Sequence, residues 1–125
     1  MTSPVWMNAV IGDFGRAAGI SGLALNERGA AALRFETGAS FRLEYTGREL
    51  VMAMTTKTAD LKRLLSQAHP QARHGLRVRA GVVPKTKEAV LAVRIAERDV
   101  TLPRLNAAFG VLWRLAGEIG GASWA

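Results

Sequence analysis

Apolar and polar side chains alternate with a period of two over residues 23–54 and again over residues 76–95. This alternation predicts strands with one apolar face and one polar or small face. Short turns that contain glycine separate the runs of the first region, so we expect its strands to pair antiparallel. The apolar positions are Leu23 and Leu25; Ala31, Leu33 and Phe35; Phe41, Leu43 and Tyr45; Leu50, Met52 and Met54; Leu76, Val78 and Ala80; and residues 90–95.

Two terminal stretches place apolar side chains at helical spacing instead. The opening helix is expected to have Ser3 as its N-cap and Pro4 at its first position, and to end near Gly19. The closing helix is expected to begin at Thr101 and to end at Gly120. The apolar stripes are Trp6, Val10 and Phe14 on the first helix, and Leu102, Leu105, Phe109, Leu112, Trp113, Ala116 and Ile119 on the last.

A short middle helix is predicted between Thr58, which can cap it, and Pro70, which stops it. Residues 69–75 are expected to form a loop. The helix presents apolar side chains next to Lys62 and Arg63, and both a dimer interface and an ordinary core position explain such a helix. Its apolar residues are Leu61, Leu64, Leu65 and Ala68.

The order of elements predicts an α+β fold, in which helices pack on an antiparallel β-sheet. We expect about five strands and three helices in the order α-β-β-β-(β)-α-β-β-α. The length of 125 residues, with no repeat or linker, predicts a single domain over residues 1–125.

The net charge of +7 comes from one part of the chain. Residues 1–56 carry five arginines and five acids, and residues 88–125 carry four of each. Residues 57–87 carry eight basic side chains against Asp60 alone. Such a block is typical of a surface with an acidic partner, or of a solvated face that keeps a protein soluble.

The sequence offers no set of residues suited to catalysis. It has no cysteine, and His69 and His74 have no cluster of acids near them, so we expect no metal site and no cofactor. Neither a glycine-rich phosphate loop nor a G-x-S-x-G nucleophile motif is present. We therefore expect a binding protein rather than an enzyme.

The opening residues MTSPVWMN lack the basic and apolar regions of a signal peptide. The longest uncharged run is the first twelve residues, which is too short to span a bilayer. The expected location is the cytoplasm, without membrane contact.

A nucleic-acid-binding protein that uses the basic block of residues 57–87 is the alternative function. Six to eight phosphate contacts would give strong, salt-sensitive binding. However, the block contains no aromatic side chain for base stacking, and no known nucleic-acid-binding motif is present.

Residues 14–20 read FGRAAGI, followed by Leu23 and Leu25, a polar turn from Asn26 to Gly29, and then Leu33 and Phe35. This pattern of F-G-R-x-x-G-[IL], L-x-L, turn and L-x-F resembles the class I chaperones of bacterial type III secretion. The middle and closing helices resemble theirs as well, so the resemblance covers nearly the whole chain. It consists of hydrophobic spacings rather than a chemical signature.

The resemblance implies a non-enzymatic dimer that binds the unfolded N-terminal segment of a secreted effector, or of an export-machine protein, and keeps it export-competent. An adaptor subunit of the export machine, without an effector of its own, stays open. Effector contacts would involve Trp6, Val10, Phe14, Leu23, Leu25 and Leu33. The dimer contact would involve Leu61, Leu64, Leu65, Leu76 and Val78.

The calculated pI of about 11.1 departs from the acidic character of most such chaperones. In a homodimer, the basic blocks of two copies would come close together, and like charges across an interface are unfavourable. We therefore expect the arginines to contact an acidic cargo or a second, acidic small chaperone in a heterodimer. The residues assigned to this contact are Lys62, Arg63, Arg77 and Arg79.

Overall fold

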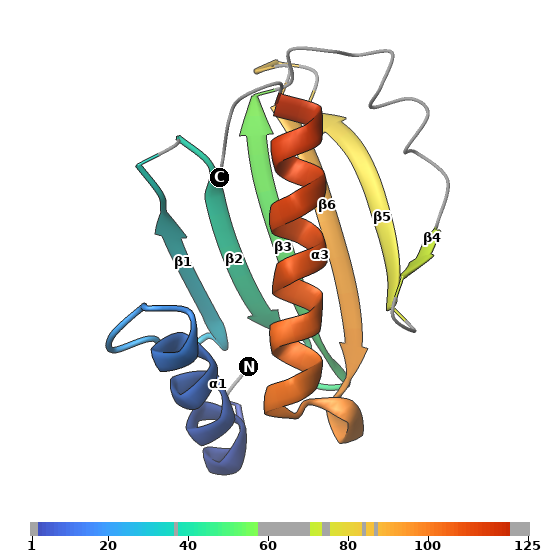
Figure 1. Cartoon of the computed structure of the whole chain (residues 1–125). Helices are drawn as coiled ribbons and strands as arrows, with labels where there is room; N and C mark the ends of the chain where they lie inside the picture. The colour runs from blue at the N-terminus through green and yellow to red at the C-terminus, as the bar shows by residue number, and fades with distance from the viewer. Residues whose placement is uncertain are drawn as a thin grey trace.

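In the described part of the chain, one antiparallel sheet of six strands forms the centre of the fold (Figure 1). The computed structural model describes residues 3–36, 38–57, 71–73, 76–83, 85–86 and 88–120. In space the strands follow the order β1-β2-β3-β6-β5-β4. Their bounds are β1 Ala30–Arg34, β2 Ser40–Tyr45, β3 Glu49–Lys57, β4 Gln71–Arg73, β5 Leu76–Val83 and β6 Glu88–Ala96.

The α+β fold class is confirmed. The sheet contains five longer strands, which is the expected number, and a sixth strand, β4, of three residues. The described residues contain two α-helices, α1 (Val5–Ala17) and α3 (Leu102–Gly120), and a 3-10 turn, η1 (Glu97–Asp99). The third predicted helix, with Leu61, Leu64 and Leu65, lies outside the described residues.

Period-two alternation gives the sheet two different faces. On the inner face, a row of directly paired apolar residues crosses four strands, from Leu43 through Met52 and Val93 to Val78. All four side chains are buried. On the outer face, the neighbouring row runs from Arg42 through Ala53 and Ala92 to Arg79. The inner face is therefore the floor of the core.

Helix α3 covers the inner face by packing on β3 and β6, and α1 packs against α3 (Figure 1). The N–H of Arg104 donates to the Thr101 hydroxyl at 3.4 Å, in agreement with the predicted cap. The buried side of α3 consists of Leu105, Ala108, Val111, Leu112, Leu115 and Ala116. In Figure 1 this helix runs in front of the two central strands, whereas neither described helix runs in front of β1.

Three local predictions were wrong. Leu23 and Leu25 are not in a strand, because the N–H of Leu25 bonds to the side chain of Asn8 on α1 rather than to a neighbouring strand. Residues 71–73, predicted as loop, form β4 because they pair with residues 76–78 of β5. The predicted Ser3 cap is also shifted by one, since Pro4 is the N-cap and α1 begins at Val5.

The buried stripe of α1 differs from the predicted one. Met7, Ile11 and Phe14 have no exposed surface, whereas Trp6 is 46% exposed. Both stripes contain Phe14, and intervals of three and four are equally helical, so the sequence pattern did not separate them. The consequence is an exposed tryptophan on the outer side of α1.

Candidate functional site

The corner between α1 and β1 is fixed by a Schellman motif. The N–H of Ile20 donates to the carbonyl of Gly15 at 2.6 Å, and the N–H of Gly19 donates to that of Arg16 at 3.2 Å. Gly19 has φ +80°, a conformation that side chains disfavour. The chain therefore reverses sharply after α1 and returns along it.

Gly15 allows that return. A Cβ atom at this position would lie 2.8 Å from the carbonyl oxygen of Ile20 and 2.8 Å from the Cβ of Leu23. Phe14, next to it, is buried, and Arg16 forms an exposed ion pair with Asp13. The F-G-R motif thus has a structural role in packing the corner.

Asn8 and Asn26 hold the segment that leads into β1. The Leu25 N–H donates to Asn8 Oδ1 at 3.0 Å, which binds this segment to α1. The side-chain oxygen of Asn26 accepts from the N–H groups of Arg28 and Ala30, and the Asn26 N–H donates to the Ala30 carbonyl at 2.8 Å. After Ala30, the segment and β1 diverge.

Strand β1 is consequently an open edge of the sheet. The backbone N–H and carbonyl groups of its odd-numbered residues point toward β2. The bonds from the Tyr45 N–H to the Gly29 carbonyl and from the Phe35 N–H to the Ala39 carbonyl, at the two ends of β1, show this pattern. The backbone groups of Ala32 and Arg34 point the other way, and no described strand pairs with them. Backbone N–H and carbonyl groups that lack a strand partner can pair with another extended chain, so this edge can accept an added strand.

Two hollows lie along this edge and share Ala32 and Leu33. One separates β1 from the preceding segment and is lined by Ile20, Gly22, Leu23, Ala24, Ala31 and others. The second continues over Arg34, Ser40 and Arg42. Together they form an elongated groove, which we call the β1 groove.

A chain of aromatic rings leads from the core toward the β1 side of the molecule. Phe109 of α3 contacts the buried rings of Phe14 and Phe41, with centroid distances of 5.6 and 5.2 Å. It also contacts Phe35, which follows β1, and Trp113, at 6.2 and 5.9 Å. Phe35, Phe109 and Trp113 are half-buried. Half-buried aromatic rings beside an open edge suit the apolar side chains of a bound peptide.

The structure separates the residues predicted to bind the effector into two groups. Phe14, Leu23 and Leu25 are buried in the core. Trp6 is exposed, and Val10 and Leu33 are half-buried. The sequence pattern assigned Phe109 and Trp113 to the core and gave Phe35 no binding role, although all three lie at its surface beside β1.

The predicted dimer residues of β5 point inward. Leu76 and Val78 are 4% and 3% exposed and pack in the core of the single chain. Leu61, Leu64 and Leu65 lie outside the described residues, as do Lys62 and Arg63. Arg77 and Arg79 lie on the outer face, where both are exposed.

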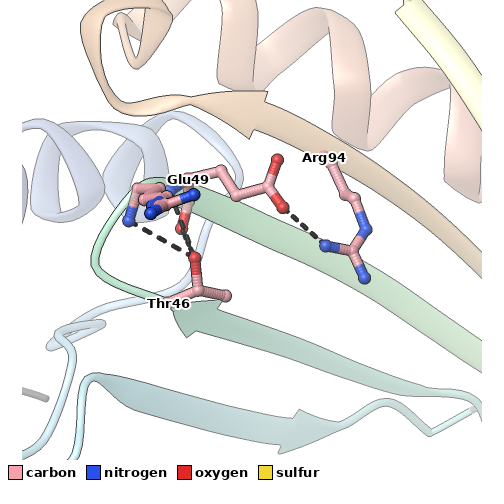
Figure 2. A network of polar contacts seen from close by, with 4 residues as sticks. Thr46, Glu49 and Arg94 are labelled. Carbon is pink, nitrogen blue, oxygen red and sulfur yellow. Dashed lines mark hydrogen bonds and ion pairs between the residues drawn. The ribbon is translucent and has the colours of Figure 1, made fainter.

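A separate hollow on the outer face is lined by Arg77, Arg79, Ala92 and Arg94. The guanidinium of Arg94 is 2.5 Å from Glu49 Oε1, the ion pair drawn in Figure 2. Glu49 itself follows a turn in which its N–H donates to the Thr46 hydroxyl at 3.2 Å. Neither Arg77 nor Arg79 forms an ion pair with a described residue.

In the part of the chain that the structure describes, no three histidines or acids come together to hold a metal ion. His69 and His74 lie outside this part. Tyr45 donates a hydrogen bond to Glu97, and this bond, with burial and the carboxylate charge, raises the pKa of Tyr45 above 10.0. That contact joins β2 to η1 and lies in none of these hollows.

No described helix is long and apolar enough to cross a membrane. Two surfaces stand out among the described residues: a groove at one edge of the sheet, lined by both apolar and polar side chains, and an arginine cluster on its outer face.

The model of the family described as "Type III secretory system chaperone SycN" matches residues 6–120. The chain belongs to this family of type III secretion chaperones. The match includes both helices almost entirely and every strand, so the SycN family assignment covers the whole fold described above. The resemblance seen in the sequence is thereby confirmed, whereas no curated protein sequence matches the chain.

Solved structures support the same fold. The chain is similar to one in the HopA1-SchA chaperone-effector complex, with 17% identity, a TM-score of 0.71 and coverage of 91% of this chain and 92% of that one. It is also similar to a chain of the ExsC-ExsE complex, with 18% identity, a TM-score of 0.74 and coverage of 97% and 96%.

A third similar structure is the Yersinia pestis type III secretion chaperone SycH in complex with a stable fragment of YscM2. Here the identity is 18%, the TM-score is 0.69 and the coverage is 90% and 98%. At these identities, the likeness describes the fold alone. The SycN family and the geometry of the two surfaces carry the functional interpretation.

Proposed function

We propose that this SycN-family chain binds an unfolded segment of a secreted effector or export-machine protein in the β1 groove and keeps it soluble and export-competent. The observation that carries the proposal is the open edge of β1, where Ala32 and Arg34 have backbone groups without a strand partner among the described residues. Membership of a family of type III secretion chaperones supports this role.

An extended peptide that pairs with β1 would place alternate side chains on the two faces of the sheet. Its inner-facing side chains would lie next to Ala31 and Leu33, close to Phe35 and Trp113. Backbone pairing would supply affinity for many sequences, and the apolar surface would select for hydrophobic residues at every second position. The peptide is bound, and no covalent bond in it is broken or formed.

Trp6 and Val10 extend the apolar surface onto α1. Trp6 is 46% exposed, and Val10 is half-buried against the core. An effector long enough to leave the β1 groove can continue over this helix. Such a partner loses conformational freedom on binding, so it needs many spread contacts to reach useful affinity.

We further propose that the working unit is a dimer that uses the predicted middle helix, through Leu61, Leu64 and Leu65. Since Leu76 and Val78 already pack in the core, β5 can contribute only its backbone and outer face to such an interface. The second subunit is another copy or an acidic small chaperone. Sedimentation of the chain alone and after co-expression with its genomic neighbours distinguishes these cases.

The test of the β1 groove is a substitution that removes only an outward backbone donor. Ala32→Pro deletes an N–H that no described strand accepts, and proline is tolerated at edge positions whose N–H faces solvent. Ala32→Val is the matched control because it keeps the N–H. The ligand is identified by pull-down from the native host, and its N-terminal segment is then titrated against both variants.

We expect Ala32→Pro to weaken binding by about tenfold, the value of a net hydrogen bond and the lost pairing around it. Ala32→Val should bind within about twofold of the unchanged chain, since a change in an exposed strand side chain is small. Equal binding by the two variants would exclude β1 pairing. Copurification of tightly held nucleic acid instead of protein would favour the alternative function.

A further inference from the structure

The outer face of the sheet carries a charge arrangement that the β1 groove does not use. Arg79 is directly opposite Ala92, and the next residues along this antiparallel pair on the same face are Arg77 and Arg94. All four line one hollow, with Ala92 as its floor. Three guanidinium groups therefore surround a small apolar floor on the side of the sheet opposite α3.

The fold neutralises this cluster only in part. Arg94 is paired with Glu49, but Arg77 and Arg79 form no ion pair with a described residue. Like charges on neighbouring strands oppose folding. The rest of residues 57–87 offers no remedy, because its sole acid is Asp60 against eight basic side chains. A bound partner with acidic side chains can supply further counter-charge.

The surroundings indicate which kind of partner fits. The neighbouring outward residues at the centre of the face are Val51, Ala53 and Val90, which are half-buried and apolar. Glu49 and Glu88 lie on the same face and interrupt its positive charge, which suits a segment with spaced carboxylates better than a continuous phosphate backbone. None of the side chains that face outward from the described strands is aromatic, so base stacking has no platform there. Small apolar positions beside arginines suit a polypeptide with glutamate or aspartate among apolar residues.

We propose that the Arg77–Arg79–Arg94 cluster on the outer sheet face binds an acidic, extended segment of a partner protein. This inference deepens the proposed acidic-partner contact and rests on that part of the proposed function, not on the β1 groove. Arg77 and Arg79 supply the free guanidinium groups, which can each hold a carboxylate by two parallel hydrogen bonds. A second copy of this chain is disfavoured as the partner because it would bring the same charges.

Glu49 limits the site. Its carboxylate occupies Arg94, so an incoming carboxylate competes with it for that guanidinium (Figure 2). Removal of the Glu49 charge should therefore strengthen the binding of an acidic segment. A gain of affinity is a sharp test because partial unfolding cannot produce it.

The probe is a fluorescein-labelled synthetic peptide of nine residues, the length of β6, in which glutamates alternate with valines. A matched peptide has glutamine in place of glutamate, and a single-stranded oligonucleotide of similar charge is the third probe. Binding is followed by fluorescence anisotropy at physiological salt with the full-length chain. Arg77→Gln/Arg79→Gln is compared with Arg28→Gln/Arg114→Gln, which removes two exposed charges elsewhere.

We expect the affinity for the acidic peptide to fall by about tenfold or more in the Arg77/Arg79 double variant, since two charge-assisted contacts disappear. The control double variant should change by about twofold or less, because distant exposed charges are screened. Glu49→Gln should tighten binding severalfold, whereas Glu27→Gln, at an exposed turn, should not. The glutamine peptide should not bind.

Equal losses of affinity in the two double variants would overturn the inference, because net charge alone would then explain the binding. Binding of the oligonucleotide but not of the acidic peptide would overturn it as well, in favour of a nucleic acid. The Ala32→Pro variant should bind the acidic peptide normally. Its behaviour separates a failure at the outer face from a failure of the β1 groove.

Discussion

The β1 groove and the arginine cluster lie on one sheet but use different physical chemistry. At β1 the unused groups are backbone N–H and carbonyl groups beside half-buried apolar side chains. Strand β6 is paired on both sides, and β5 pairs with β6 over residues 78–83 and with β4 over residues 76–78; on their outer face the unused groups are the guanidinium side chains of Arg77 and Arg79. The first surface can select a conformation, and the second can select a charge.

The difference follows from position in the sheet. An edge strand leaves every second residue's backbone groups open, whereas an interior strand offers only its side chains. A chain that binds an unfolded partner benefits from both, because an extended conformation is common to many partners and a charge pattern is not. Substitutions can alter one surface while the other serves as the control, or can alter the frame that holds both.

The largest expected effect is the loss of the aromatic packing beneath the β1 groove. Phe41→Ala removes a ring that is 1% exposed and contacts Phe14 and Phe109. The free energy of unfolding should fall by about 3–5 kcal/mol, as for other buried phenylalanines. Denaturant titration checks this. Trp113→Ala, at the half-buried end of the same aromatic chain, should cost clearly less; an equal cost would mean that Trp113 serves the core rather than the groove.

The next effect concerns the corner that positions β1. Gly15→Ala places a Cβ atom 2.8 Å from the Ile20 carbonyl oxygen and from the Leu23 Cβ. Because the backbone must shift, the free energy of unfolding should fall by about 1–3 kcal/mol. Gly12→Ala is the matched control on the same helix, with its nearest neighbour at 3.8 Å. It should be neutral or stabilising by up to about 1 kcal/mol, and thermal unfolding of the two variants would expose any reversal of this order.

Salt should separate the two surfaces. Raising the ionic strength from low to high should weaken the binding of the acidic peptide to the arginine cluster by about tenfold, since exposed charges are screened. Binding in the β1 groove should change by about twofold or less, because backbone pairing and apolar contacts supply it. Titrations of each ligand over a salt series measure both slopes. Parallel slopes would show that the two surfaces are not chemically distinct.

The smallest expected effect concerns the hydrogen bond between Tyr45 and Glu97, which lies away from both surfaces. The raised pKa of Tyr45 means that the folded chain holds the phenol proton more tightly than the unfolded chain does. The stabilisation is therefore complete below about pH 10 and is lost as the pH rises through the folded-state value. Thermal unfolding at alkaline pH should show this fall in the unchanged chain. Tyr45→Phe should remove that component, and a pH dependence unaltered by Tyr45→Phe would contradict the assignment.

Much of the sheet could be predicted from sequence because its alternation is local. Phe41, Leu43 and Tyr45 appear as one buried face in the pattern and in the structure. The turn at Asn26–Gly29 was predicted for the same reason, since its signals lie within four residues. The resemblance to class I type III secretion chaperones arose in part from that turn, together with the FGRAAGI motif and the L-x-L and L-x-F spacings on either side of the turn.

The missed features depend on contacts distant in the chain. Leu23 and Leu25 alternate like a strand, but their segment is bound by Asn8, and Leu25 lies seventeen residues from that side chain. Strand β4 has no apolar run and exists through its pairing with β5. Nothing in the sequence joins Arg94 to Arg77 and Arg79, and only the sheet register places it beside them. Sequence patterns show the face of an element, whereas tertiary pairing determines what that face meets.

Amide hydrogen exchange at single residues tests the central claim, that β1 binds its ligand as an added strand. In the free chain, the amides of Ala32 and Arg34 should exchange fast, while those of Ala31 and Leu33, which face β2, should exchange slowly. When the effector segment binds, Ala32 and Arg34 should become protected and the other two should change little. Bound effector with Ala32 and Arg34 still exchanging at the free rate would contradict the account.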